Sequence, residues 1–376
     1  MTKISKGKIH VFYYNEFEWS GQLAEETMNI LVKAQEIICK DIGLKEAHYG
    51  LALLYEEQPR SIPSTHATRY QEKDGTPYTV FPEVFATYGG RAWFSDYFTK
   101  VMKGKPFFSD DLLAIKDLKD EILSTQVHEM VHMMLMETIG HISPSLRWLD
   151  DGLAEFCSYY AARFIDPSVS REKLSNRLKD IAKYAPDKNR CFNLLSWGYF
   201  LNQPVHELSI TAPDKQEFIL GYKDSSDLQG LKESIRKAHE ILNKDKEKWD
   251  KEVSIFINYY IRDWEEYLMF LEGHPDSNEI KVTDKTSIEG YAITFAMFLE
   301  IYNKDGIKPL FSFIQKLSQQ DNLFYCNNKE NNKIFLLYSS QVLELLNQET
   351  GEKWIQDNLN YPVNKAVKTI KEYLGK

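Results

Sequence analysis

The sequence predicts a protein of the α+β class, with a small mixed layer at the N-terminus followed by a long helical part. Residues 9–14 and 49–55 are short runs rich in β-branched and aromatic residues, which are typical of strands. Between them, residues 18–40 show the three-to-four spacing of apolar residues that is typical of a helix. Residues 59–90 are rich in Pro, Gly and Thr and predict strands and loops, whereas helical spacing dominates from residue 109 onward.

The helices of the second part are predicted from the spacing of their apolar residues and from the residues that end them. Residues 118–138 form one predicted helix, which Gly140 ends. A second covers residues 149–165 and stops before Pro167, because proline cannot continue the backbone hydrogen-bond ladder. The same spacing predicts further helices over residues 228–243, 249–271, 288–302, 309–319, 334–347 and 365–374.

These elements suggest two parts of the chain. Residues 1–168 would combine the N-terminal layer with the helices over 118–138 and 149–165. Residues 169–376 would form a mostly helical part. The length of 376 residues suffices for such a division, since most domains hold between about 50 and 250 residues.

Charge and cysteine content exclude several classes of partner and site. The net charge of −9 at pH 7 argues against a nucleic acid or an anionic membrane surface as the partner. The four cysteines are far apart and form no Cys-x-x-Cys pair, so we expect neither a disulfide framework nor a thiolate zinc site. No signal peptide or apolar stretch long enough to span a membrane is visible, and we therefore expect a cytoplasmic protein. The sequence leaves the oligomeric state open.

A His-Glu-x-x-His motif lies within the predicted helix over 118–138. His128 and His132 are four residues apart, so both imidazoles project from one face of the helix and can reach one metal ion. Glu129 lies about a third of a turn away, where it can take a proton from a water that the metal activates. The alternative is a pair of core histidines bonded to neighbouring carbonyl groups, since apolar residues surround the motif.

The next predicted helix offers a third ligand. A catalytic zinc ion takes three protein ligands and keeps one position open for water. Asp151 and Glu155 are four residues apart and share a helix face, which a short antiparallel return would place against the histidines. An acidic helix N-terminus, favoured by the helix dipole, is the structural alternative for Asp151. The two segments together predict a zinc site.

With these residues in place, the chain resembles the gluzincin metallopeptidases, which include thermolysin, the aminopeptidase N family and the peptidase-MA-like domains. In that group the histidine motif is followed by a segment Trp-Leu-x-Glu-Gly-x-Ala-Glu-Tyr. Residues 148–156 read Trp-Leu-Asp-Asp-Gly-Leu-Ala-Glu-Phe and are similar to it. Eighteen residues, 133 through 150, separate His132 from Asp151, a spacing common in the aminopeptidase branch. The departure is Asp151, which stands where the family has its ligand Glu.

The resemblance implies a zincin, thermolysin-like catalytic domain and zinc-dependent hydrolysis of a peptide or protein substrate, with Glu129 as the base. Asp151 would be the third ligand, with Glu155 hydrogen-bonding a histidine or replacing Asp151 as ligand. Residues 284–320 resemble the family's later helical segment, which packs back on the active site. Tyr291, within that segment, would donate a hydrogen bond to the oxyanion.

Two further expectations concern activity. The aspartate at the ligand position supports an alternative, in which a zincin-like fold with weak or no turnover serves as a binding or regulatory module. The Gly-x-Met-Glu-Asn motif with which aminopeptidases hold a free amino terminus is absent from the sequence. We therefore expect blocked peptides to be better substrates than small aminoacyl compounds.

Overall fold

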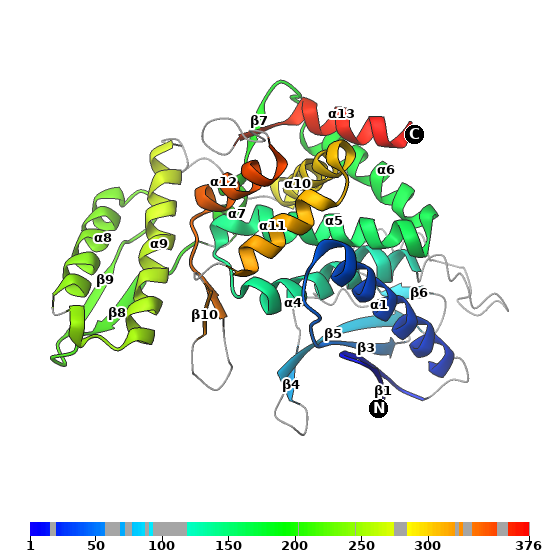
Figure 1. Cartoon of the computed structure of the whole chain (residues 1–376), viewed down its shortest axis with the longest axis horizontal. Helices are drawn as coiled ribbons and strands as arrows, with labels where there is room; N and C mark the ends of the chain where they lie inside the picture. The colour runs from blue at the N-terminus through cyan, green and yellow to red at the C-terminus, as the bar shows by residue number, and fades with distance from the viewer. Residues whose placement is uncertain are drawn as a thin grey trace. The chain divides into compact units, whose positions relative to one another are not determined.

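The computed structural model describes most of the chain as helices and short strands, which confirms the α+β class (Figure 1). The described residues are 1–15, 20–56, 68–71, 77–86, 90–92, 119–201, 203–244, 246–273, 284–319, 323–325, 333–351 and 360–375. They divide into two compact units. One unit holds Met1–Glu137 and Cys157–Lys173, and the other holds Thr138–Phe156 and Leu174–Lys376.

The first unit contains a mixed sheet. Its strands are β1 (Thr2–Lys6), β2 (Ile9–Tyr13), β3 (Tyr49–Glu56), β4 (Thr68–Gln71), β5 (Pro77–Ala86) and β6 (Gly90–Ala92). They run in the order β1-β2-β3-β5-β4, with β6 also paired to β5. The β2–β3 and β3–β5 pairs are parallel and the others are antiparallel. The predicted strands over 9–14 and 49–55 are confirmed as β2 and β3, whereas β1 was not predicted.

Helix α1 (Ser20–Ile42) connects the parallel strands β2 and β3 and lies across the sheet (Figure 1). Parallel neighbours need such a crossover. The helix buries one apolar stripe, which includes Leu23, Leu31 and Ile38. The helix ends at Ile42, and Gly43 follows with a φ of +84°, a left-handed conformation that a residue without a Cβ adopts at little cost.

The helix that carries the histidine motif begins irregularly. Residues 119–121 are helical, Ile122–Gln126 form a π-helical turn, and α4 covers Val127–Ile139. The predicted end at Gly140 is confirmed, with a φ of +84°. The π turn was not predicted, since the apolar spacing of a helix does not distinguish it. Such turns occur often at functional sites.

Helix α5 (Arg147–Ile165) follows a short connector that contains a 3-10 turn, Pro144–Leu146. The helix ends before Pro167 as predicted. Pro167 then starts a further helix, α6 (Pro167–Tyr184), which was not predicted. Proline is tolerated in the first turn of a helix, because the N–H that it lacks would have no partner there.

The second unit is mostly helical. Besides α6, most of which belongs to this unit, its helices are α7 (Leu194–Leu201), α8 (Leu228–Asn243), α9 (Lys251–Gly273), α10 (Asp284–Asp305), α11 (Lys308–Gln319), α12 (Ser339–Thr350) and α13 (Val363–Leu374). Five predicted helices are confirmed to within a few residues, as α8, α9, α10, α11 and α13. The prediction over 334–347 is wrong at its start. Residues Lys333–Phe335 form strand β11, which pairs with β10 (Leu323–Tyr325), and Phe335 donates its backbone N–H to the carbonyl oxygen of His141.

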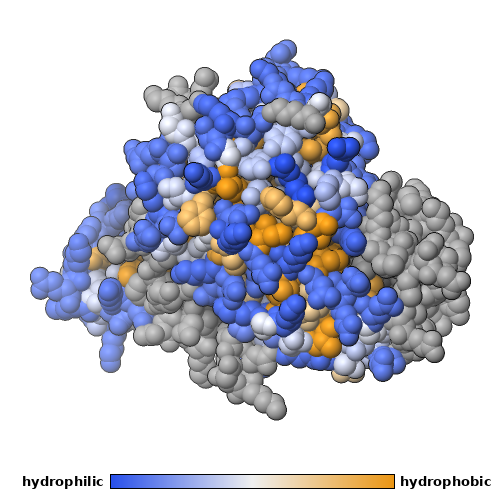
Figure 2. All heavy atoms as spheres, turned by 45° about the vertical axis from the view of Figure 1, so that its right-hand side comes forward, coloured by the Kyte–Doolittle hydropathy of each residue, from blue (hydrophilic) through white to orange (hydrophobic). Residues whose placement is uncertain are grey.

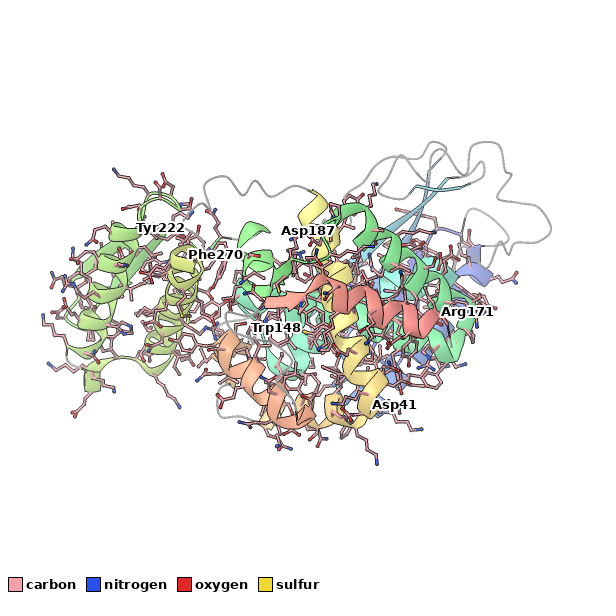
Figure 3. All side chains as sticks on the ribbon, turned by 90° about the horizontal axis from the view of Figure 1, so that it is seen from above. Asp41, Trp148, Arg171, Asp187, Tyr222 and Phe270 are labelled. Carbon is pink, nitrogen blue, oxygen red and sulfur yellow. The ribbon has the colours of Figure 1, made fainter. Side chains whose placement is uncertain are left out.

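Helices α8 and α9 share an aromatic-rich core with the hairpin of β8 (Glu207–Thr211) and β9 (Glu217–Gly221). Tyr222 and Phe270, labelled in Figure 3, belong to this core. A second short sheet pairs β7 (Cys191–Asn193) with β12 (Asn360–Pro362).

The face drawn in Figure 2 is mostly hydrophilic, with hydrophobic residues gathered in smaller patches between the polar ones. Across the described ranges, we find no helix whose length and hydrophobicity would let it cross a membrane.

Candidate metal centre

Three of the predicted ligands come together. His128, His132 and Asp151 each offer one ligand atom, and these atoms all lie within 4.8 Å of one another. The Nε2 atoms of His128 and His132 are 3.0 Å apart. His128 and Asp151 are buried, and His132 is half-buried. In the part of the chain that the structure describes, no other group of three or more His, Cys, Asp or Glu residues has this geometry.

The packing of α4 fixes the direction in which the two histidines point. The helix carries fully buried apolar side chains around most of its circumference, namely Val127, Met130, Val131, Met134 and Leu135. Since a helix repeats every 3.6 residues, fixing these side chains in the core fixes the direction of His128 and His132 as well. The two imidazole rings meet edge to face, with centroids 4.7 Å apart.

The donor set fits a zinc ion. Imidazole nitrogen and carboxylate oxygen are ordinary zinc ligands, at bond lengths of about 2.0–2.2 Å. Two tetrahedral nitrogen ligands at that length lie roughly 3.3 Å apart, close to the 3.0 Å between the histidine nitrogens. A set of two histidines and one carboxylate is that of a catalytic zinc site, which keeps a fourth position for water. His128, His132 and Asp151 would hold the ion.

Arg147 lies one helical turn before Asp151 and contacts it directly. The Arg147 Nε atom is 2.7 Å from Asp151 Oδ2, and the Arg147 Nη2 group donates a hydrogen bond of 3.1 Å to the hydroxyl oxygen of Tyr291. Burial raises the pKa of Tyr291 well above its ordinary value, and the charge of Asp151 raises it further. The charge and hydrogen bond of Arg147 oppose both effects, but Tyr291 stays protonated at neutral pH.

Glu155 lies one turn after Asp151 and pairs with a different arginine. Arg177, on α6, donates a hydrogen bond from Nε to Glu155 Oε2 at 3.1 Å, and its Nη2 atom lies 2.8 Å from the same oxygen. Burial would lower the pKa of Arg177, but Glu155 and Asp180 outweigh it and raise the pKa, so Arg177 stays charged. Glu155 does not belong to the group of converging ligand atoms. This arrangement favours Asp151 over Glu155 as the third ligand.

Two glycines let α10, which carries Tyr291, approach its neighbours closely. A Cβ on Gly152 would lie 2.8 Å from Thr294 Cβ and 3.0 Å from Phe298 Cε2, both on α10. A Cβ on Gly290 would overlap the ring of Trp197 on α7. The glycine after the ligand position is therefore needed for packing, and it brings Tyr291 near Asp151.

The connector between α4 and α5 is held by a buried polar network. Ser145 donates its hydroxyl hydrogen to Glu266 of α9, and the backbone N–H of Ser339 donates to the same carboxylate. Trp148, labelled in Figure 3, donates its indole N–H to Ser339 Oγ at 2.8 Å. Asp263 lies beside this network and is also buried. The network anchors the chain that leads into Asp151.

The structure thus brings His128, His132 and Asp151 together. It bonds Tyr291 to Arg147, the ion-pair partner of Asp151, and it pairs Glu155 with Arg177. Glu129 follows His128 on α4 and is half-buried. Arg147, Arg177 and Trp197 were not among the predicted site residues. Arg147 could have been found from its position four residues before Asp151, a spacing at which charged side chains meet on a helix. Arg177 belongs to a helix that was not predicted and gave no such signal.

Comparison with the models of known families, with curated proteins and with solved structures finds no match to this chain.

Proposed function

We propose that this chain is a zinc-dependent metallopeptidase with a zincin-like catalytic part, which hydrolyses peptide bonds in a peptide or protein substrate. The observation that carries the proposal is the convergence of His128, His132 and Asp151 within 4.8 Å, with Glu129 at the second position of the histidine motif. A zinc ion, when bound there, supplies a Lewis acid that polarises a carbonyl group and lowers the pKa of water toward ~7.

Glu129 is the residue that we assign to proton transfer. It follows His128 directly, so it points about 100° away round the helix and lies beside the ligands instead of among them. Its carboxylate accepts one proton from the attacking water. It then donates that proton to the leaving nitrogen as the C–N bond breaks, so that water is added across the amide bond.

Tyr291 is the residue that we assign to the oxyanion. Its hydroxyl oxygen accepts a hydrogen bond from Arg147, and its own hydrogen is available to a negatively charged oxygen. Its raised pKa supports this role, since only the protonated hydroxyl can donate. A donor directed at the tetrahedral intermediate acts where charge develops.

The test is the pair of variants Glu129→Gln and Glu137→Gln. Both replace a carboxylate on α4, but Glu137 is exposed and lies more than a turn beyond His132. Glu129→Gln should keep about one zinc ion per chain, because the ligands remain. It should lower turnover of a peptide library by ~10²–10⁴, the usual contribution of a general acid or base. Glu137→Gln should keep both metal and activity.

Two results would contradict the proposal. The first is a zinc content near zero in the wild-type protein, measured by elemental analysis after equilibration with zinc, which would show that the protein does not bind zinc. Peptidase activity that survives in Glu129→Gln, or that a chelator does not abolish, would assign the hydrolysis to other residues. A zinc-loaded wild-type protein that cleaves no peptide would favour the binding or regulatory module.

A further inference from the structure

We propose that Arg147 is a positioning residue that holds Asp151 and Tyr291 with one guanidinium group. It thereby links the third metal ligand to the oxyanion donor. This inference rests on the proposed function, because it assigns a role to Arg147 in the same site. It goes beyond the histidine motif and the carboxylates, neither of which includes this arginine.

The contacts come from two atoms of the same side chain. The Nε atom of Arg147 is 2.7 Å from the Asp151 carboxylate, and Nη2 donates to the Tyr291 hydroxyl at 3.1 Å. The guanidinium is planar and its donors keep a fixed mutual geometry. Contact with both partners therefore fixes the Tyr291 hydroxyl relative to the Asp151 carboxylate.

Aromatic rings hold the guanidinium in place. The Arg147 Cζ atom lies 5.0 Å from the ring centroid of Trp197 and 5.7 Å from that of Tyr291. Both distances are within the range of cation–π attraction. Trp197 is fully buried, and its ring meets that of Tyr291 edge to face, with centroids 5.1 Å apart. Packing against a buried ring restricts the rotamers of Arg147, which a positioning role requires.

The charges explain why Asp151 needs this partner. Asp151 is buried, with 7% of its surface exposed, and an ionised carboxylate out of water must be paired. The groups around a ligating carboxylate set its orientation toward the metal, and the observed neighbour of Asp151 is the ion-paired Arg147 guanidinium. A carboxylate has two oxygens, so the pair with Arg147 is compatible with metal coordination.

The hydrogen bond to Tyr291 has a second effect. When a hydroxyl oxygen accepts a bond from a cation, its own O–H becomes a stronger donor, because hydrogen bonds in a chain polarise one another. Arg147 thus both orients Tyr291 and strengthens its donation. Lysine would keep the charge beside Asp151, but it lacks the planar fork that contacts both partners at once.

Arg177 offers a matched control. Its guanidinium lies 5.9 Å from the same Tyr291 ring centroid, and its side chain is about as exposed as that of Arg147, 20% against 18%. It pairs with Glu155, however, and not with Asp151. General effects of removing a charge near Tyr291 should appear in both Arg147→Gln and Arg177→Gln. A loss of zinc affinity should appear only in Arg147→Gln.

The experiment measures the zinc affinity of Arg147→Gln, Arg147→Lys and Arg177→Gln by competition with a chromogenic chelator. We expect Arg147→Gln to bind zinc ~10–100-fold more weakly, the usual loss when the partner of a ligand is removed. Arg147→Lys should lose less, and Arg177→Gln should stay within about threefold of wild type. Affinity within about twofold of wild type in both Arg147 variants would overturn the proposal. So would a loss in Arg177→Gln as large as that in Arg147→Gln.

The link to Tyr291 is measured as kcat at saturating zinc. Tyr291→Phe should lower kcat by ~10²-fold or more, as the loss of an oxyanion donor does. Adding Arg147→Lys to Tyr291→Phe should lower kcat little further. Arg147 affects kcat through the Tyr291 hydroxyl, and phenylalanine lacks this group. Fully additive effects would overturn this part. Circular dichroism checks the fold of each variant, and if Arg147→Gln does not fold, the lysine variant decides alone.

The two proposals fail in different ways. A wild-type protein that binds zinc but cleaves no peptide contradicts the proposed function, while the zinc affinities of the arginine variants still test the role of Arg147 toward Asp151. An active wild-type enzyme whose Arg147 variants keep their zinc affinity contradicts the role of Arg147 alone.

Discussion

Replacing Asp263 with Asn should remove a large pH dependence from the stability of the protein. Asp263 lies on α9 and is buried, beside Arg262 and one turn before Glu266. Burial raises the pKa of Asp263 from 3.8 to about 7. The charge of Arg262 opposes this effect and that of Glu266 adds to it, while a hydrogen bond with Ser143 lowers the pKa.

The sign follows from the difference between the folded and unfolded states. With the higher pKa, the folded protein holds a proton on Asp263 between about pH 4 and pH 7, whereas the unfolded chain has released it. The free energy of unfolding therefore falls as pH rises through this range and levels off above about pH 7. A difference of about 3 pKa units corresponds to roughly 4 kcal/mol, as an order of magnitude. That is a large part of the stability of a typical domain, ~5–15 kcal/mol.

Asparagine has nearly the shape of the protonated aspartate and does not titrate. We expect Asp263→Asn to be about as stable as wild type at pH 5 and more stable at pH 8, by up to about 4 kcal/mol. Arg262 remains held in the variant, because its Nη1 group donates to the carbonyl oxygens of Phe335 and Leu337, at 2.6 and 3.0 Å.

The assay is urea unfolding of both proteins at pH 5, 6, 7 and 8, followed by circular dichroism. Only the difference between variant and wild type is compared, so that the titration of other groups cancels. Glu240→Gln, at an exposed position on α8, is the control and should show no such trend. A stability difference that is the same at pH 5 and pH 8 would refute the reasoning.

Three further predictions concern the ligands, the substrate and the cysteines. Asp151→Ala should nearly abolish tight zinc binding, whereas Glu155→Ala should weaken it by ~10–100-fold at most; the reverse order in a chelator competition would make Glu155 the ligand. Long blocked peptides should be cleaved faster than free-amino aminoacyl anilides, and fast hydrolysis of the anilides with inert blocked peptides would contradict this. Cys191 is exposed and should react with a thiol reagent in the folded protein, whereas burial raises the pKa of the Cys157 thiol and should protect it until the protein unfolds. Mass spectrometry of the labelled peptides distinguishes the two sites.

Elements that bury one regular face could be predicted from the sequence. Helix α1 shows its apolar stripe at three-to-four spacing, and Gly43 ends it where the chain needs a left-handed residue. Strand β2 is buried at four of its five positions, which requires the apolar run seen in the sequence. The histidine motif could be predicted for the same reason, because two residues that are four apart on a helix lie on the same face.

Elements without such a face could not be predicted. Strand β1 is exposed at four of five positions and carries no apolar pattern. Helix α7 is only eight residues long and almost continuously apolar, so no period can be recognised. Residues 334–335 continue an apolar spacing into α12, but they form a strand because a partner strand and His141 bind their backbone.

The same distinction applies to the site. His128, His132 and Asp151 could be predicted from local spacing and from a family pattern. The pairing of Arg177 with Glu155 depends on two helices that meet in three dimensions. No local spacing encodes that contact, so the sequence alone leaves both carboxylates as candidate ligands, whereas in the structure Asp151 converges with the two histidines.

The close approach of α7 to the connector before α5 can be tested with Gly198→Ala. A Cβ at residue 198 would lie 2.6 Å from the carbonyl carbon of Pro144 and would overlap its oxygen. Alanine should stabilise a helix by ~1 kcal/mol relative to glycine, but overpacking costs ~1–3 kcal/mol or more. The overlapping atoms belong to the backbone, and no side chain can rotate away, so we expect a net loss of stability.

The displacement should also reach the candidate metal site, since Pro144 precedes Asp151 by seven residues in the same connector and helix. We expect Gly198→Ala to unfold at lower urea concentration than wild type and to bind zinc more weakly. Gly21→Ala is the control: the nearest atom to its Cβ would be the Tyr13 hydroxyl oxygen at 3.7 Å, an ordinary contact, so stability should be unchanged or higher. A Gly198→Ala protein as stable as Gly21→Ala, with unchanged zinc affinity, would show that the connector is free to move and that its buried network does not set the position of Asp151.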